Sequence, residues 1–301
     1  MARSAYFVIN IDGDPDPPHG PRNDRRVLDK YRVMQKLMDD FAEGKGVICV
    51  HTSPIYRDRF LRDPFMDFWR EWTANGGELA LHPEEDLYAT AQTRLSEGNH
   101  YDHISHMEPI ISELADFMQS NGVPFAAYKG GFHGLTMAIV QVLVRAGIEI
   151  DLTGAPGIVW PTKTADWSGA PASAYYMSQE AYRKPAESGT GCGMFEIPTA
   201  FDGQVSDTGN RFLLNRHYLA VGRSTLGDLY RVWNAIIERG ERSARPQIVA
   251  LVSHTHALHR EEFHQECAAV LEYVRKHGGV PVTAREAKRI YDEHQAVLPA
   301  S

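Results

Sequence analysis

Residues 6–16 read YFVINIDGDPD, and this stretch sets a pattern that the rest of the chain repeats. Its first part, Tyr6 to Ile11, is a short apolar run of β-favouring residues, which predicts a buried strand. The strand ends at a group of acids. Apolar runs of the same kind predict further strands at residues 46–51, 78–82, 124–128, 148–152, 194–197 and 247–252.

Helical patterns lie between most of these strands. Apolar residues recur at helical spacing after His103 and again after Glu262. Alternating strands and helices are typical of an α/β fold with a mainly parallel sheet, either open or closed into a barrel. No linker, repeat or charge block divides the sequence, so we expect one domain over residues 1–301. Residues 153–193 are predicted to be the least regular part and a candidate wall of a binding cleft.

The composition fits a folded protein and excludes several classes. The 301 residues carry 31 Lys and Arg against 39 Asp and Glu, a net charge of −8, which argues against binding nucleic acid by neutralising its phosphates. Three cysteines without CxxC spacing exclude a disulfide framework and a thiolate zinc site. The sequence shows no secretory signal and no apolar stretch near the roughly 20 residues of a membrane span. We therefore expect a cytoplasmic protein, and a homo-oligomer is compatible with the sequence.

Asp12 and Asp14 follow the first predicted strand. Side chains two apart in extended backbone share a face, so these carboxylates are expected to project together. One of them would bind a cation, while the other would accept a proton. An ordinary acidic turn is the alternative. An EF-hand is excluded because the sixth loop position is not glycine and no helix flanks it.

His82 ends another predicted strand and is followed at once by Glu84, Glu85 and Asp86. Neutral imidazole and carboxylate together suit zinc or a similar divalent cation, although a lone strand-end histidine is often structural. A second group of histidines is a weaker metal candidate, because an exposed helix start explains it equally well. This group consists of His100, His103 and His106.

Lys129 lies in YKGGFHG, residues 128–134, again after a strand, where it can place a positive charge beside a catalytic carboxylate. His254 and His256 follow the late strand and are expected to share a face, so that one serves as a general acid and the other supports it. Surface histidines in a turn are the alternative. The glycine-rich residues 189–193 are predicted to form a plain loop, with Cys192 an ordinary member of it.

All these polar groups follow the carboxyl ends of predicted strands, which is the edge where α/β barrels and open α/β sheets build their active sites. In chain order, the motifs IDGD, LALHPEED, YKGGFHG, DWSGAP, MFEIP and VSHTH resemble the polysaccharide deacetylase superfamily. These are metal-dependent amide hydrolases with a NodB homology domain, like carbohydrate esterase family 4. The resemblance covers nearly the whole chain. It implies a distorted (β/α)7-type barrel and a divalent metal, most commonly Zn²⁺.

The resemblance also implies roles for the acids and the first histidine. Asp12 matches the catalytic base, Asp14 the metal-binding aspartate and His82 the first histidine ligand. Asp86 stands where the family usually has a second histidine. Some relatives place that histidine two residues earlier, where this chain has Glu84, so the third ligand is ambiguous.

Lys129 stands where the family has an arginine that orients the base, so the charge is kept but the bidentate fork is lost. His254 best matches the general acid, with His256 as its rival. The implied activity is hydrolysis of an N-acyl amide, foremost an N-acetyl group on a sugar or polysaccharide intermediate, or another small amide. Three aromatic residues would stack on sugar rings or simply pack the loop, namely Trp160, Trp167 and Tyr176.

Two other functions are compatible with the sequence. A glycosyltransferase could use Asp12-Gly13-Asp14 as a DxD clamp for a metal and a nucleotide sugar, but this leaves the strand-end histidines without a role. A relative that has lost activity could keep the barrel and bind saccharides without hydrolysing them.

Overall fold

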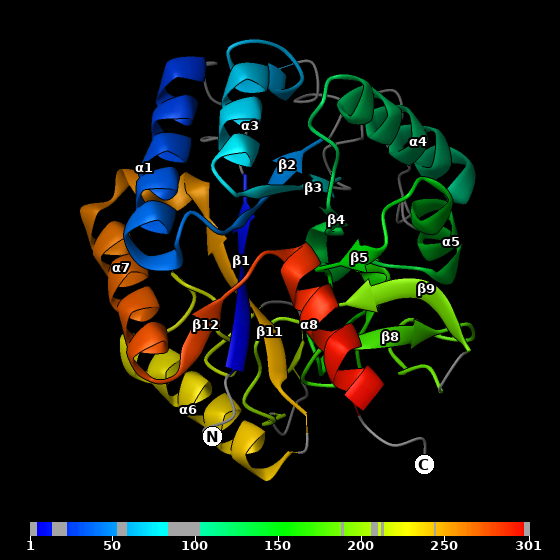
Figure 1. The fold of residues 1–301 in the computed structure, drawn as a ribbon, viewed down its shortest axis with the longest axis vertical. Coiled ribbons are helices and arrows are strands. Elements are labelled where there is room, and N and C mark those ends of the chain that lie inside the picture. Colours follow the sequence, from blue (N-terminus) through cyan, green and yellow to red (C-terminus); the bar gives the residue numbers. More distant parts are fainter. Residues whose placement is uncertain are drawn as a thin grey trace.

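Parallel strands form the centre of the molecule (Figure 1). The structure is a computed structural model, and it describes residues 5–13, 23–52, 59–83, 103–187, 190–205, 210–211, 214–243 and 245–297. Within them, seven strands run parallel in the order β11-β1-β2-β3-β4-β5-β9. These are β1 (Ala5–Asp12), β2 (Val47–His51), β3 (Glu78–His82), β4 (Ala127–Tyr128), β5 (Ile150–Asp151), β9 (Gly191–Glu196) and β11 (Gln247–His254).

The two ends of this sheet meet. The chain that continues from β9 reaches β11, where Thr199 and Ala250 form a parallel bridge. Ala250 N donates to Pro198 O and Ala200 N donates to Ala250 O, both at 2.8 Å. The sheet is therefore curled into an α/β barrel, and the fold that the sequence predicted is confirmed.

Helices cover the outside of the curled sheet (Figure 1). The helices expected after His103 and Glu262 are confirmed as α4 and α7. The covering helices are α1 (Asp24–Ala42), α3 (Phe65–Ala74), α4 (Ile104–Ser120), α5 (Met137–Arg145), α6 (Leu226–Arg242) and α7 (Glu261–Lys276). None of the described helices is both long enough and apolar enough to cross a membrane.

The last helix, α8 (Ala284–Val297), closes the end of the barrel at which the strands begin. Ala284 and Ala287 pack against Val8 and Val47 inside the barrel. Ala284 N also donates to Oε2 of Glu78, the first residue of β3, at 2.8 Å. α8 therefore covers the barrel interior at this end, and the polar residues that follow the strands lie at the opposite end, where the strands finish.

Side chains alternate between the inside of the barrel and the helical layer outside. On β1, Phe7, Ile9 and Ile11 pack among the outer apolar residues, whereas Val8 packs inside. The two-residue period therefore turns Asp12, at the end of the same strand, inward.

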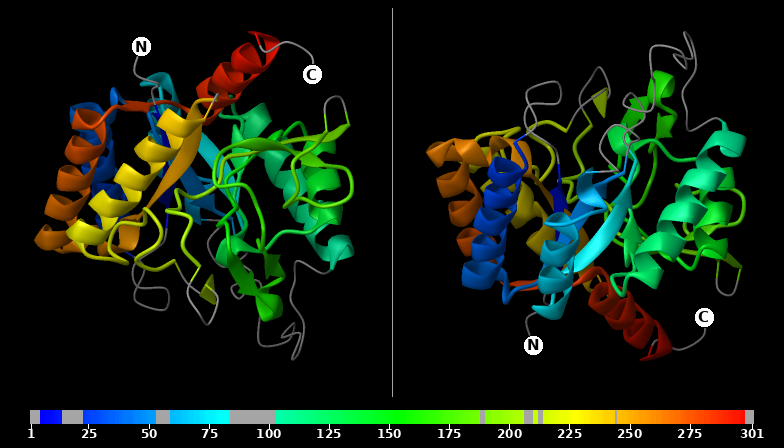
Figure 2. Two further views of the ribbon diagram at one scale, coloured as in Figure 1. Left: turned by 90° about the horizontal axis from the view of Figure 1, so that it is seen from below. Right: turned by 90° about the horizontal axis from the view of Figure 1, so that it is seen from above.

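Residues 153–193 contain more regular structure than predicted. They include β6 (Ile158–Trp160), the 3-10 turn η4 (Pro161–Lys163), β7 (Ala165–Asp166) and β8 (Tyr175–Ser178). β10 (Asn210–Arg211) pairs with β6, and β12 (Gly279–Pro281) pairs with β1. Figure 2 shows β6 and β7 at the opposite end of the barrel from α8.

The prediction of a plain loop at residues 189–193 is wrong for Gly191 to Gly193, because these residues begin β9. Gly191 pairs with Ser178 of the antiparallel strand β8. The hydrogen bonds of this ladder stabilise a glycine-rich stretch that has little strand propensity of its own.

Candidate functional site

Five polar side chains occupy inward positions where neighbouring strands end. The alternation that turns Val8, Cys49, Ala80, Ala127 and Ala250 into the barrel also turns inward the polar residues that follow them in the same period. The strands concerned, β11, β1, β2, β3 and β4, are consecutive in the sheet. The five residues are Asp12, His51, His82, Lys129 and His254.

Asp12 is the centre of this group. Lys129 donates from Nζ to Oδ1 of Asp12 in an ion pair whose two side chains are both buried. The second carboxylate oxygen, Oδ2, lies 3.4 Å from Nε2 of His254. One oxygen of Asp12 is thus held by a lysine, while the other faces a histidine.

The turn after Asp12 is fixed by close contacts of Gly13. Gly13 N donates to Cys49 O at 3.1 Å, and Tyr31 donates from its hydroxyl to Gly13 O at 2.8 Å. A Cβ at Gly13 would lie 2.6 Å from the Tyr31 hydroxyl and 2.7 Å from Cys49 O. Only glycine fits there without displacing the backbone that carries Asp12.

His82 has the orientation of a histidine ligand to a metal. Its Nδ1 lies 2.8 Å from the carbonyl oxygen of Lys129. A carbonyl can only accept, so Nδ1 carries the proton and the lone pair is on Nε2. A backbone carbonyl on the far nitrogen is the usual support of a metal-bound histidine. His82 therefore fits the divalent metal that the sequence resemblance implies.

His51 was missed by the sequence analysis. It is buried, pairs in register with His82, and its ring centroid lies 5.7 Å from that of His82. The signal was present in GVICVH, residues 46–51, which ends a strand in a histidine as residues 78–82 do. Unlike His82, His51 is not followed closely by acids.

Several predicted ligands lie outside the described residues, namely Asp14, Glu84, Glu85, Asp86 and His100. Within the described residues, no three His, Cys, Asp or Glu side chains are grouped so that they could hold a metal ion. His103 and His106 begin α4, where His103 is the N-cap residue.

His256 lies beside His254, with their ring centroids 5.2 Å apart. It does not continue the strand, because β11 ends at His254 and the 3-10 turn η5 (Thr255–His259) follows. Lys30 of α1 donates from Nζ to the carbonyl oxygen of His256 at 3.1 Å. The ion-pair contact to Asp12 is made by His254.

His133 is a second histidine that the sequence analysis did not select. It is buried, and its Nδ1 lies 2.9 Å from the carbonyl oxygen of Thr153. Burial, with the charge of Lys129 nearby, lowers the pKa of His133 to about 4. The ring is therefore neutral near pH 7.

The three aromatic candidates have different environments. Trp167 is fully buried and donates from Nε1 to His133 O at 2.8 Å, so it packs the core and cannot stack on a sugar. Tyr176 lies on β8 and donates from its hydroxyl to Asp292 of α8, the helix that covers the other end of the barrel. Trp160 is partly exposed, and its ring meets the edge of Phe132 at a centroid distance of 5.5 Å.

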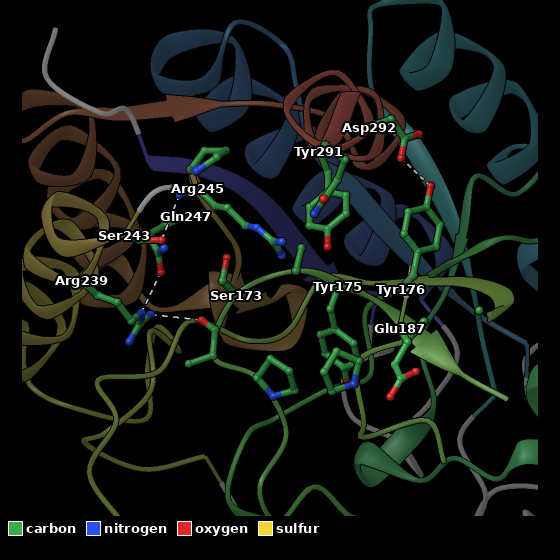
Figure 3. Close-up of a pocket in the computed structure, with 18 of the residues that line it drawn as sticks. Ser173, Tyr175, Tyr176, Glu187, Arg239, Ser243, Arg245, Gln247, Tyr291 and Asp292 are labelled. Atoms are coloured by element: carbon green, nitrogen blue, oxygen red, sulfur yellow. Dashed lines mark hydrogen bonds between the residues drawn. The ribbon is translucent and has the colours of Figure 1, made fainter. Parts of the chain in front are cut away.

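A cavity of about 800 Å³ lies away from the Asp12 group. Its wall includes Gln247, the first residue of β11, whereas His254 is the last residue of that strand. Figure 3 shows tyrosines on one side of it and Arg239 with Gln247 on the other. Residues 171–176 of the irregular segment line this cavity.

The fold is shared with several solved structures. A Mycobacterium smegmatis structure assigned as a polysaccharide deacetylase has a TM-score of 0.56 at 14% identity, covering 100% of this chain and 94% of that one. A Parabacteroides distasonis structure assigned as a glycoside hydrolase/deacetylase has a TM-score of 0.64 at 13% identity, covering 97% and 72%. The Puue allantoinase has a TM-score of 0.57 at 13% identity, covering 100% and 93%.

The sequence itself matches no protein-family model and no curated protein. At these identities the likeness establishes the fold. The chain shares an α/β barrel fold with these structures, as the sequence predicted.

Proposed function

We propose that the protein is a metal-dependent hydrolase of an N-acyl amide, with an N-acetyl group on a sugar or polysaccharide intermediate as the foremost substrate. One observation carries the proposal: Asp12 lies between Lys129 and His254 at the carboxyl edge of the barrel. A base, a cation that keeps the base ionised and a proton donor are the groups that amide hydrolysis needs. Deacetylases among the fold neighbours support the same reaction class.

His82, together with Asp14 and with Asp86 as third ligand, would hold the metal, most commonly Zn²⁺ in such a set. The bound ion would supply Lewis-acid polarisation of the acyl carbonyl. The carbonyl oxygen of Lys129 keeps the proton of His82 on Nδ1, so Nε2 is presented as the donor atom.

Asp12 would take the proton of the attacking water. Lys129 donates to Oδ1, which favours the ionised carboxylate, and Oδ2 would take the proton. His254, 3.4 Å from Oδ2, would give a proton to the departing amine nitrogen. Because Asp12 and His254 are neighbours, the proton removed from water can return to the leaving group over a short path.

The DxD alternative fits the geometry less well. A carboxylate that clamps a cation with a nucleotide sugar must be available to that cation, whereas Asp12 is held by a buried lysine. Asp12 is therefore proposed as the base and not as a cation clamp. Residues 1–301 are proposed to form one catalytic domain.

The test is a metal and product analysis of protein purified with added zinc. We expect about one divalent metal per chain and acetate release from N-acetylated glucosamine oligomers. The same protein is also assayed with a panel of small amides, including allantoin, to test for hydrolysis of other C–N bonds. A metal-free protein, or one that binds the oligomers without releasing acetate, would contradict the proposal, and the second result would favour a saccharide-binding relative.

A further inference from the structure

Two carboxyl side chains are buried next to each other on the outer face of the barrel. Asp151 ends β5 and Glu196 ends β9, and the two residues are register partners in the parallel pair. Both have 0% exposure. Their neighbours Ile150 and Phe195 face inward, so these acids face away from the Asp12 group, under the cover of residues 153–182.

Each carboxyl group receives hydrogen bonds on one oxygen. Asp151 Oδ1 accepts from Thr153 N at 3.1 Å and from Thr153 Oγ1 at 2.5 Å. Glu196 Oε1 accepts from Gly154 N at 2.9 Å. The remaining oxygens, Oδ2 and Oε2, are buried and receive no donor from the described residues. The two carboxyl groups lie within hydrogen-bonding reach of each other, and a proton shared between them would satisfy these oxygens.

Among the described residues, no cationic side chain contributes to the pKa shifts of the two acids. Tyr175 on β8 and Tyr182 in the loop after it are titratable neighbours of the pair, and burial together with the charge of the acids raises the pKa of both hydroxyls. Neither tyrosine can be cationic. Burial raises the pKa of Asp151, and burial together with the charge of Asp151 raises the pKa of Glu196. Two ionised carboxylates in this place would be strongly unfavourable, whereas a pair with one proton is stable.

Thr153 connects this pair to the loop that carries Lys129. Its hydroxyl donates to Asp151 and accepts from Gly130 N at 2.8 Å. Its carbonyl oxygen accepts from His133 Nδ1 at 2.9 Å. Gly130 itself cannot be replaced, because a Cβ there would lie 2.1 Å from Gly134 O. The hydrogen bonds therefore run from Asp151 through the Thr153 hydroxyl to Gly130, which directly follows Lys129, the residue that holds Asp12.

We propose that Asp151 and Glu196 share one proton and that, through Thr153, they are positioning residues that hold the Lys129 loop against Asp12. With one shared proton, the pair consists of one neutral carboxylic acid and one carboxylate. All four of their oxygens then take part in hydrogen bonds. The carboxyl group of Asp151 in turn orients the Thr153 hydroxyl, so that its lone pair faces Gly130 N. The consequence for turnover rests on the proposed function, whereas the shared proton and the loop anchoring do not.

The shared proton is tested by the pH dependence of stability. In the unfolded chain both carboxyls ionise near their ordinary pKa of about 4, whereas the folded pair keeps a proton at higher pH. The folded state then binds more protons, so wild-type stability falls as pH rises from about 4 through the folded pKa. Relative to Glu196→Gln, which donates a fixed N–H in place of the proton, the wild-type unfolding constant should rise about tenfold per pH unit.

Glu180→Gln is the matched control, because Glu180 is exposed on the neighbouring loop. It should keep the wild-type pH dependence. Parallel stability curves for wild type and Glu196→Gln would overturn the shared proton. If Glu196→Gln does not fold, infrared spectra of the wild-type protein near pH 7 decide: a protonated carboxyl band supports the pair, and its absence overturns it.

The anchoring is tested without any substrate by amide hydrogen exchange. Thr153→Val removes the hydroxyl that bridges Asp151 and Gly130, and we expect exchange at Gly130 to rise about tenfold, as for the loss of one hydrogen bond. Thr153→Ser keeps the hydroxyl and should restore protection. Unchanged exchange in Thr153→Val would overturn the anchoring. Where acetate release is measurable, Thr153→Val should lower kcat more than it changes KM.

Discussion

Lys129 and Asp12 lie 117 residues apart in the sequence and form a buried ion pair where β4 and β1 end. Neither charge is stable there without the other, because both side chains are almost fully removed from water. The pair therefore supports the fold as well as the proposed chemistry, and the two contributions can be separated by mutation.

Replacing Asp12 by Asn should lower acetate release by about 10²–10⁴-fold, because the amide cannot take a proton from water. The amide oxygen still accepts from Lys129, so the variant should fold and keep its metal. Turnover is measured together with metal content. Asp116→Asn on the exposed face of α4 is the control and should behave as wild type. Wild-type turnover in Asp12→Asn would refute the base assignment.

Lys129→Met should lower the free energy of unfolding by about 3–5 kcal/mol, since it leaves the Asp12 carboxylate buried without its cation. In the double variant Asp12→Asn with Lys129→Met, the loss should be smaller than the sum of the two single losses. Denaturant titration of the four proteins measures this. Strictly additive losses would mean that the ion pair does not couple the two residues.

His254→Gln should reduce turnover by about 10²–10⁴-fold, whereas His256→Gln should have a much smaller effect. The reason is that Nε2 of His254 lies 3.4 Å from Asp12 Oδ2, whereas His256 lies beyond the end of β11, in the turn η5. Initial rates at several pH values compare the variants. A larger loss in His256→Gln would exchange the two roles.

His133 should make the protein less stable in acid. Its folded pKa of about 4 lies below the unfolded value near 6.5, so the unfolded chain binds the proton more readily. Stability contributed by neutral His133 is thus complete above about pH 6.5 and is lost as pH falls through about 4, to a total on the order of 3 kcal/mol. Denaturant titrations across this range should show a weaker acid loss in His133→Gln. Equal losses of stability in the wild type and in His133→Gln would show that His133 does not cause the acid sensitivity.

Gly13→Ala should destabilise the protein by about 1–3 kcal/mol, because the new methyl group would meet the Tyr31 hydroxyl and Cys49 O. Gly227→Ala is the matched change in α6, where a Cβ meets nothing nearer than 3.8 Å. That variant should gain about 0.4–1 kcal/mol. Thermal denaturation compares them, and a harmless Gly13→Ala would show that the turn after Asp12 is not tightly packed.

The placement of Asp12, His82 and His254 at one edge was predictable, because it requires only apolar runs of period two that end in polar residues. The strand-end pattern also placed the charge of Lys129 beside a catalytic carboxylate, whereas its match to the arginine that orients the base came from the family resemblance. His51 could have been found by the same strand-end reasoning as His82.

The carboxyl pair needed the structure. The runs IEIDL and MFEI contain Asp151 and Glu196 at positions where a strand buried on both faces has apolar residues, and that mismatch was the available signal. What buries them is the cover provided by residues 153–182, which periodicity predicted as irregular. The burial of Trp167 and the low pKa of His133 depend on the same cover.

Strand β1 lies between β11 and β2, and its first residue pairs with Gln247. During synthesis β1 is made more than two hundred residues before β11. The hydrogen bonds between these two strands can therefore form only late. Asp12 reaches His254 only after β11 has been made, and β12 and α8 then complete the barrel. A nascent chain that ends before β11 therefore carries Asp12 without its partner in the proposed proton transfer.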